Sequence, residues 1–161
     1  MNSQYNTEIE RLYLRMYDRL FAYARSTLSN DSLAEEAVQE TFRIACQKPE
    51  ELLNSPRPEG WLINTLKNVM SNMIRSRAIA NRILSEYIAA QTPEYSESVE
   101  GIRFEILYEN ISEMEEFQLI KEMAVDGLSH LEMAEKRGIS VAACKKRVQR
   151  AKEVLRKKIK I

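Results

Sequence analysis

The sequence is poor in the residues that interrupt helices and in those that build metal sites. It has four glycines, four prolines, two cysteines and one histidine among 161 residues. Few glycines and prolines, together with plentiful glutamate, leucine, alanine, arginine and lysine, favour helices. One histidine and no cluster of cysteines provide too few ligands for a zinc site, so we expect neither a metal nor a cofactor. The two cysteines, Cys46 and Cys144, are expected to be small core hydrophobes rather than a disulfide.

The chain also lacks long apolar stretches. No window approaches the roughly 18 consecutive apolar residues that a transmembrane helix needs. The first ten residues, MNSQYNTEIE, do not show the basic and then apolar order of a signal peptide. We therefore expect a cytoplasmic protein that does not insert into a membrane. There is no glycine-rich phosphate loop and no histidine-based dyad, so an enzyme is not expected.

Charge is unevenly distributed, although the formal net charge is zero. Residues 1–84 carry 11 basic and 10 acidic side chains, residues 85–128 carry 2 and 11, and residues 129–161 carry 11 and 3. A basic end behind an acidic middle is expected when one end of a protein meets a polyanion. A solvated helix face could carry the same charges, so the motif within the basic segment decides between the two interpretations.

Apolar residues recur at helical spacing along much of the chain. The first two stripes follow pairs that fit capping boxes, Thr7 with Glu10 and Ser32 with Glu35. A third helix is expected to begin near Pro58, because proline suits the first helical position. These patterns predict an all-α protein.

A polar stretch separates the helical segments into two groups. Residues 91–101 are acidic and contain one proline and one glycine, and helical spacing resumes at Ile102. We predict two small helical domains, residues 1–84 and 105–161, joined by an acidic linker of residues 85–104.

The segment GLSHLEMAEKRGISVAACKKRVQRAKEVLRKKI, residues 127–159, shows the spacing of a helix-turn-helix. Two closely crossing helices need a small residue at the crossing, a residue tolerant of positive φ in the turn, and an apolar residue buried by the second helix. Ala134, Gly138 and Cys144 stand at the matching positions. The alternative interpretation is a helical hairpin with a solvated basic face.

The second helix of this motif has an outer face suited to DNA. Ser129 and Ser140 are placed to cap the two helices. Small side chains near the start of the second helix would let its backbone approach a groove, and basic side chains would reach phosphates or guanine edges. The candidate duplex-binding residues are Ala142, Ala143, Lys145, Lys146, Arg147 and Arg150.

The expected third helix carries several asparagines opposite its apolar face. Asparagine is a mediocre helix former, so this number of amides indicates polar contacts. Amides flanked by arginine and lysine suit unpaired bases and their phosphates. Trp61 either stacks on a base or belongs to the core. The candidate single-strand-binding residues are Trp61, Asn64, Lys67, Asn68, Ser71, Asn72 and Arg75.

The helix expected within LAEEAVQETFRIACQK, residues 33–48, has an apolar stripe and an opposite polar face. By itself this pattern describes an ordinary amphipathic helix. The polar face carries Glu36, Gln39, Glu40 and Arg43.

Taken together, these segments resemble the extracytoplasmic-function, or group IV, sigma factors of bacterial RNA polymerase, which belong to the sigma-70 family. Residues 31–45 are similar to conserved region 2.2, residues 59–77 to regions 2.3 and 2.4, and residues 126–159 to region 4.2. Many regulators share a helix-turn-helix, so its pairing with the upstream segments makes the resemblance specific. Ala142-Ala143-Cys144 stands where Gly-Thr-Val is frequent in the family, so the promoter sequence is not predicted.

The resemblance implies a transcription initiation factor. Its N-terminal domain would bind the clamp helices of the polymerase's largest subunit through Glu36, Gln39, Glu40 and Arg43. The asparagine-rich helix would recognise and open the −10 element, and the basic helix would read the −35 element. The implied partners are core RNA polymerase, through its clamp helices and flap, promoter DNA, and an anti-sigma factor.

Two other functions fit parts of the sequence. A sigma-like decoy would bind an anti-sigma factor without initiating transcription, but it would not need the basic face of residues 141–158. An ordinary helix-turn-helix regulator would form a stable dimer on a palindromic operator. A sigma factor would instead bind core polymerase as a monomer.

Overall fold

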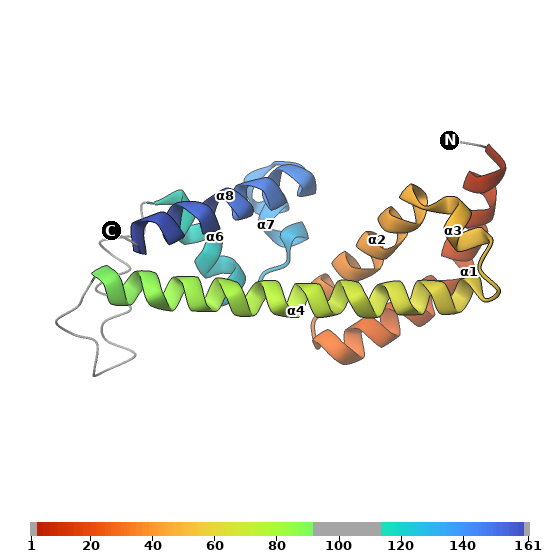
Figure 1. Ribbon diagram of the computed structural model, residues 1–161, viewed down its shortest axis with the longest axis horizontal. Helices are drawn as coiled ribbons and strands as arrows, with labels where there is room; N and C mark the ends of the chain where they lie inside the picture. The colour runs from red at the N-terminus through yellow and green to blue at the C-terminus, as the bar shows by residue number, and fades with distance from the viewer. Residues whose placement is uncertain (1–2, 92–113, 160–161) are drawn as a thin grey trace. The chain divides into compact units, whose positions relative to one another are not determined.

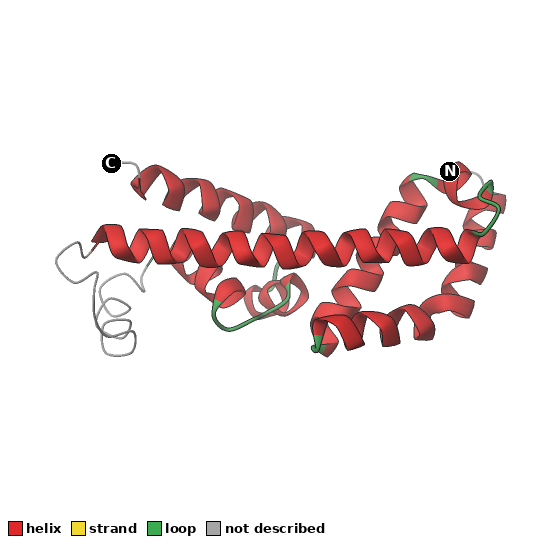
Figure 2. Cartoon of the chain, turned by 60° about the horizontal axis from the view of Figure 1, so that its bottom comes forward, coloured by secondary structure: helices red, strands yellow, loops and turns green. Residues whose placement is uncertain are grey.

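The computed structural model describes residues 3–91 and 114–159, and every regular element among them is a helix (Figures 1 and 2). None of the described helices is long and apolar enough to span a membrane. Because all regular elements of the described residues are helices, the predicted all-α class is confirmed. The helices are α1 (Ser3–Leu28), α2 (Asp31–Gln47), α3 (Pro49–Leu53), α4 (Pro58–Gln91), α6 (Glu115–Ala124), α7 (His130–Arg137) and α8 (Val141–Ile159).

The chain forms two compact units, Met1–Ile74 and Arg75–Ile161, and α4 contributes residues to both. The sequence pattern places a boundary after residue 84, whereas α4 continues to Gln91. The proposed linker beyond residue 91 and the apolar stripe that begins at Ile102 lie outside the described residues. The assignment of functions to residues 1–84, 85–104 and 105–161 stays a prediction.

The core of the first unit is built by apolar stripes of α1, α2 and α4. Leu12, Met16 and Leu20 of α1 are spaced by four residues, so they share one buried face. The buried face of α2 contains Ala34, Ala37 and Ala45, each fully buried, and such short side chains allow close helix packing. The first half of α4 completes this core with Leu62, Leu66, Val69 and Met70.

The starts of α1 and α2 differ from the predicted capping boxes. Helix α1 begins at Ser3, so Thr7 lies inside it and donates its hydroxyl hydrogen bond to the Ser3 carbonyl at 3.1 Å. Helix α2 is capped by Asn30, whose side chain accepts a hydrogen bond from the Leu33 backbone N–H at 2.9 Å. Asparagine is among the best N-cap residues. Asn30 therefore takes the role that we predicted for Ser32.

Helix α1 ends at Leu28 and is followed by a serine with left-handed backbone. Ser29 has φ 55°, and its N–H donates to the Arg25 carbonyl at 2.8 Å. A Cβ is unfavourable in this conformation, whereas glycine adopts it readily. We expect Ser29→Gly to raise the free energy of unfolding of the first unit by about 0.5–1 kcal/mol, as measured by urea denaturation. The matched control is Ser26→Gly within the exposed face of α1, which should lower it by a similar amount. Destabilisation by Ser29→Gly would contradict the prediction.

The core of the second unit combines the second half of α4 with α6, α7 and α8 (Figure 1). Tyr87 of α4 is buried, and its ring centroid lies 6.1 Å from that of Phe117 in α6. Ala80, Ile83 and Leu84 belong to the same core. Because these residues continue one helical stripe past residue 84, the boundary suggested by composition falls within a packed helix.

The two cysteines differ in their surroundings. Cys144 is buried in the second core, as predicted, whereas Cys46 is exposed, contrary to the prediction. Cys46 lies at the edge of the apolar stripe of α2, where it lines a shallow depression with Tyr13 and Phe42. The helical spacing of Cys46 resembles that of a core residue, but among the described residues this edge of α2 stays exposed.

Candidate nucleic-acid interface

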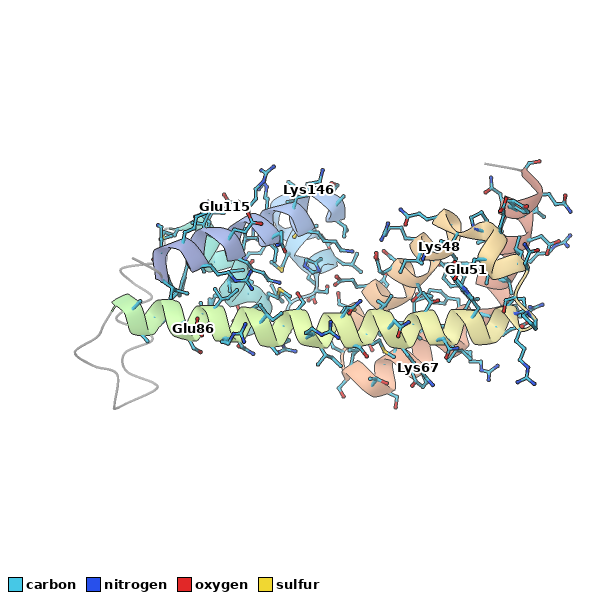
Figure 3. The ribbon with its side chains drawn as sticks, in the orientation of Figure 1. Lys48, Glu51, Lys67, Glu86, Glu115 and Lys146 are labelled. Carbon is cyan, nitrogen blue, oxygen red and sulfur yellow. The ribbon has the colours of Figure 1, made fainter. Side chains whose placement is uncertain are left out.

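The polar face of α4 carries six of the candidate single-strand-binding residues on exposed positions: Asn64, Lys67, Asn68, Ser71, Asn72 and Arg75. Their spacing of three or four residues aligns them along one side of the helix. Figure 3 shows the Lys67 side chain extending from α4. Within the described residues, none of the six side chains makes a hydrogen bond or ion pair. Their amides, hydroxyl and cations are therefore available to a ligand.

Trp61 differs from these six residues. Its ring is half-buried and packs against the core of the first unit. Its indole Nε1 donates a hydrogen bond to Glu51 Oε1 in α3 at 3.3 Å. These contacts fix the ring beside the polar face of α4. Stacking of Trp61 on a base stays a prediction.

Helices α7 and α8 form the predicted helix-turn-helix. Ser129 caps α7 by accepting a hydrogen bond from the Glu132 N–H, and the Glu132 side chain accepts one from the Ser129 N–H. Gly138 follows α7 with φ 64°, in the left-handed conformation. Ala134 is 2% exposed and Cys144 is fully buried. The three positions identified from their spacing therefore have the predicted environments.

The start of α8 is also as predicted. Ser140 Oγ accepts a hydrogen bond from the Ala143 N–H at 3.1 Å. This bond satisfies one of the free donors of the first helical turn. The cap therefore fixes where α8 begins and which side chains of its first turns point outward.

The candidate duplex-binding residues of α8 occupy two kinds of position. Ala142, Lys146, Arg147 and Arg150 are exposed, and Lys146 is labelled on α8 in Figure 3. Ala143 and Lys145 are instead half-buried, although we predicted that both would lie on the outer face.

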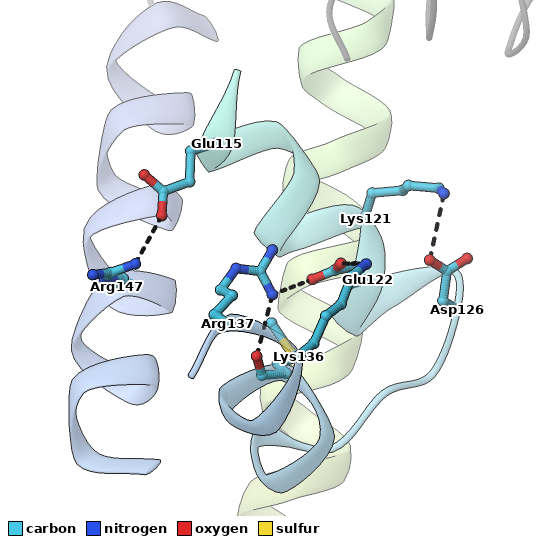
Figure 4. Close-up of polar contacts among 8 residues, drawn as sticks. Glu115, Lys121, Glu122, Asp126, Lys136, Arg137 and Arg147 are labelled. Carbon is cyan, nitrogen blue, oxygen red and sulfur yellow. Dashed lines mark hydrogen bonds and ion pairs between the residues drawn. The ribbon is translucent and has the colours of Figure 1, made fainter. Parts of the chain in front are cut away.

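Arg147 is already engaged within the second unit. Its Nη1 atom lies 3.2 Å from Glu115 Oε1 in α6, and both side chains are exposed (Figure 4). Exposed ion pairs contribute about 0–1 kcal/mol. A phosphate or a guanine edge can therefore replace Glu115 at a small cost. The sequence pattern did not identify this contact.

A buried carboxylate, Glu122 of α6, links α6 to α7 through ion pairs. Glu122 is 3% exposed, and its Oε1 accepts a hydrogen bond from Lys136 Nζ at 2.5 Å (Figure 4). Arg137 Nη1 lies 2.7 Å from Oε2 as an ion pair, although Oε2 accepts no well-aligned hydrogen bond. Burial raises the pKa of Glu122, but the two cations outweigh burial and lower the pKa below its ordinary value of 4.5.

The candidate polymerase-binding face lies on α2. Arg43 donates hydrogen bonds to both carboxylate oxygens of Glu40, at 2.8 and 2.6 Å. Gln39 is exposed and donates to Glu35 Oε1 at 3.1 Å. Glu36 is only 5% exposed, so its predicted place on an exposed face is wrong. Helical spacing places Glu36 on the polar face of α2. It does not show which other parts of the chain bury this side chain.

The candidate residues on the exposed faces of α4 and α8 include amides, a hydroxyl and cations, which suit nucleic acid better than metal chemistry. Among the described residues, no group of three or more His, Cys, Asp or Glu side chains is arranged to hold a metal ion. One helix therefore offers unpaired polar groups, and another offers a basic face within a helix-turn-helix.

Two family models match these same segments of the chain. The model of sigma-70 region 2 matches residues 12–79, and the model of sigma-70 region 4 matches residues 116–155. The chain belongs to the sigma-70 family. Its pairing of region 2 with region 4 is the signature of the extracytoplasmic-function type. No curated protein and no solved structure gives a significant match.

The sigma-70 regions coincide with the two candidate surfaces. Region 2 contains the polar face of α4, and region 4 contains the helix-turn-helix. The two regions indicate a sigma factor's role in promoter recognition and imply interaction with core RNA polymerase and promoter DNA. Sigma-70 family members are initiation factors rather than enzymes. The resemblance stated from the sequence is thus confirmed.

Proposed function

We propose that this protein binds core RNA polymerase, recognises a −10 element through region 2 and a −35 element through region 4, and promotes melting of promoter DNA. The observation that carries the proposal is the presence of two chemically different surfaces in one sigma-70 family chain. One is the unpaired polar face of α4, and the other is the basic outer face of α8.

The polar face of α4 suits the single-stranded part of this task. Melting requires that bases leaving the stack be held, at a cost of a few kcal/mol each. Asn64, Asn68 and Asn72 can hydrogen-bond the edges of such bases, while Lys67 and Arg75 can contact the adjacent phosphates. Ser71 lies among these residues, between Asn68 and Asn72, and Trp61 precedes Asn64 by about one helical turn. The absence of hydrogen-bond partners for the three amides among the described residues favours this role.

The basic face of α8 suits duplex anchoring. A recognition helix reads base edges in the major groove while cations on it neutralise phosphates. Ala142 and Ala143 leave room for the approach of the backbone, and Lys146 and Arg150 can contact DNA without losing an ion pair within the described residues. Arg147 would exchange Glu115 for DNA, and Lys145 would have to extend from its half-buried position.

The polymerase contact is assigned to α2, with Gln39, Glu40 and Arg43 on its surface and Glu36 as a buried member of the predicted set. We place this activity in the cytoplasm, where transcription takes place in bacteria. An anti-sigma factor stays a partner suggested by the family, and no residue is assigned to it.

The test is a run-off transcription assay with bacterial core polymerase, the full chain and a library of random promoter fragments. We expect discrete transcripts that share two spaced elements. Asn68→Ala should lower their yield about tenfold or more, because a bidentate hydrogen bond from an amide to a base edge is worth about 1–3 kcal/mol. Arg150→Ala should also lower it. Asn81→Ala is the matched control, because Asn81 is an exposed asparagine of α4 just beyond the region 2 match.

The possible failures of this assay are distinguishable. Binding to core polymerase without any transcripts would indicate a decoy. No binding to core polymerase, with a stable dimer on palindromic DNA, would indicate an ordinary helix-turn-helix regulator. An equal loss of transcription in Asn68→Ala and Asn81→Ala would show that the polar face of α4 has no special role.

A further inference from the structure

Ile74 is an exposed apolar residue on α4, among the candidate single-strand-binding residues. Its exposed fraction is 53%, whereas Met70, one helical turn earlier, is 3% exposed and belongs to the core of the first unit. Among the described residues, Ile74 is part of neither of the two apolar cores. Single exposed apolar side chains are common on protein surfaces. The neighbours of Ile74 on the helix therefore decide whether it has a function.

These neighbours are polar or small, and they are exposed themselves. Residues three or four positions apart lie on the same side of a helix. Ile74 belongs to such a row of exposed residues on α4: Lys67, Ser71, Ile74 and Ala78. Ser71 and Ala78 have short side chains, so Ile74 protrudes between them. Arg75, the next residue, is exposed as well. A base can therefore reach the Ile74 side chain beside a hydroxyl and a cation.

The pairing of Ser71 with Ile74 suits thymine better than the other bases. Thymine presents an acceptor, O4, beside its C5-methyl group, whereas cytosine presents an amino donor and no methyl group. A serine hydroxyl can donate to O4, and an aliphatic side chain can cover the methyl group. Side chains of a helix lean toward its N-terminus, so Ile74 leans toward the turn that carries Ser71. The two side chains are thus placed for the two neighbouring groups of thymine.

We propose that Ile74 is a specificity-determining residue of region 2 and that it contacts the C5-methyl group of a thymine in the −10 element. This inference rests on the proposed function, in which the polar face of α4 holds the −10 strand. Ile74 lies within the segment that matches sigma-70 region 2, residues 12–79. Cations on this face can contact the phosphates of any sequence. An apolar contact instead distinguishes a base that carries a methyl group from one that lacks it.

Removal of single methyl groups from the promoter tests this contact. The −10 element is taken from the run-off assay, and each of its thymines is replaced in turn by deoxyuridine, which pairs as thymine does but lacks the methyl group. Binding of each fragment to core polymerase that carries the full chain is measured by competition with the unmodified fragment. At one position we expect the wild type to lose about fourfold in affinity, the value of one buried methyl group.

Ile74→Ser should bind the unmodified promoter about fourfold more weakly and should no longer distinguish thymine from deoxyuridine at that position. Serine and isoleucine have similar helix propensities, so α4 should keep its structure, which circular dichroism checks. Ile74→Val keeps a branched apolar side chain and should retain most of the discrimination. The matched control is Val125→Ser, because Val125 is 50% exposed and follows α6 in the second unit. It should discriminate thymine as the wild type does.

The outcomes of this experiment separate the contact from other effects. Any effect of deoxyuridine on the stability of the duplex is the same for both proteins, so the difference between wild type and Ile74→Ser reports the side chain alone. Equal discrimination by the two proteins would overturn the inference. A −10 element without thymine, or one in which the wild type discriminates no thymine, would do the same and leave the proposed function intact. Failure of the wild-type chain to bind core polymerase or to give transcripts would overturn the proposed function itself.

Discussion

Glu122→Ala is expected to lower the free energy of unfolding of the second unit by about 3 kcal/mol. Removing one partner of a buried ion pair leaves the other charge buried without a counter-ion. The carboxylate is 3% exposed and holds Lys136 and Arg137 of α7 from its position in α6. Lys136 can turn to solvent, since its side chain is 61% exposed. Arg137 is 16% exposed and would remain partly buried without its counter-ion. The loss should therefore come mainly from Arg137.

The effect of this substitution should depend on pH. The folded-state pKa of Glu122 lies below its ordinary value of 4.5. Its ion pairs therefore stabilise the fold fully above the unfolded-state pKa. That contribution is lost as the pH falls through the folded-state pKa. The difference between the wild type and Glu122→Ala should be largest near neutral pH and should shrink in acid. Urea denaturation followed by circular dichroism at neutral and acid pH measures it.

Two controls accompany this prediction. Lys136→Ala removes the exposed partner and should cost less than about 1 kcal/mol, as exposed ion pairs do. The single tryptophan, Trp61, lies in the first unit, so its fluorescence should report a transition that moves little in either variant. A cost for Lys136→Ala equal to that for Glu122→Ala would contradict the assignment of the main effect to Arg137.

Phe117→Ala is expected to have the other large effect, about 3–5 kcal/mol of stability in the second unit, the range for truncating a buried aromatic side chain. Phe117 is 1% exposed and contacts Tyr87. Its removal would leave a cavity between α6 and α4. The transition seen by circular dichroism should shift to lower urea concentration, by an amount that does not shrink in acid, because no titrating group is lost.

Phe117→Leu is the matched control for this cavity. It retains most of the buried apolar volume and should cost less than about 1.5 kcal/mol. A similar cost for the alanine and leucine variants would mean that ring geometry, rather than volume, determines the stability here.

The predictions from the sequence were most accurate for turns and helix caps, where the local backbone conformation permits few residue types. The turn at Gly138 was predictable because few residues adopt positive φ, and the caps at Ser129 and Ser140 because few side chains satisfy free N–H groups. The first two helix starts were less predictable, since several polar residues compete for the cap and Asn30 takes it instead of Ser32.

Local sequence rules did not predict contacts between residues that are far apart in the chain. Nothing in the spacing of α6 distinguishes Glu122, which is buried with two cations, from the exposed Glu115. Glu36 likewise looks like a surface residue of an amphipathic helix and yet is buried. The same limitation applies to Lys152, whose place beside the apolar stripe of α8 is visible in the sequence, while its partner Ser76 is 76 residues away.

Because α4 contributes residues to both units, it limits where the chain can be divided into fragments for expression. A fragment of residues 105–161, chosen from composition, would lack Ala80, Ile83, Leu84 and Tyr87 and would expose the apolar surface that they cover. Such a fragment should be prone to aggregation. A C-terminal fragment that keeps its core has to start inside α4, near residue 75. A fragment boundary placed between the two units therefore falls inside α4, and each fragment contains only part of this helix.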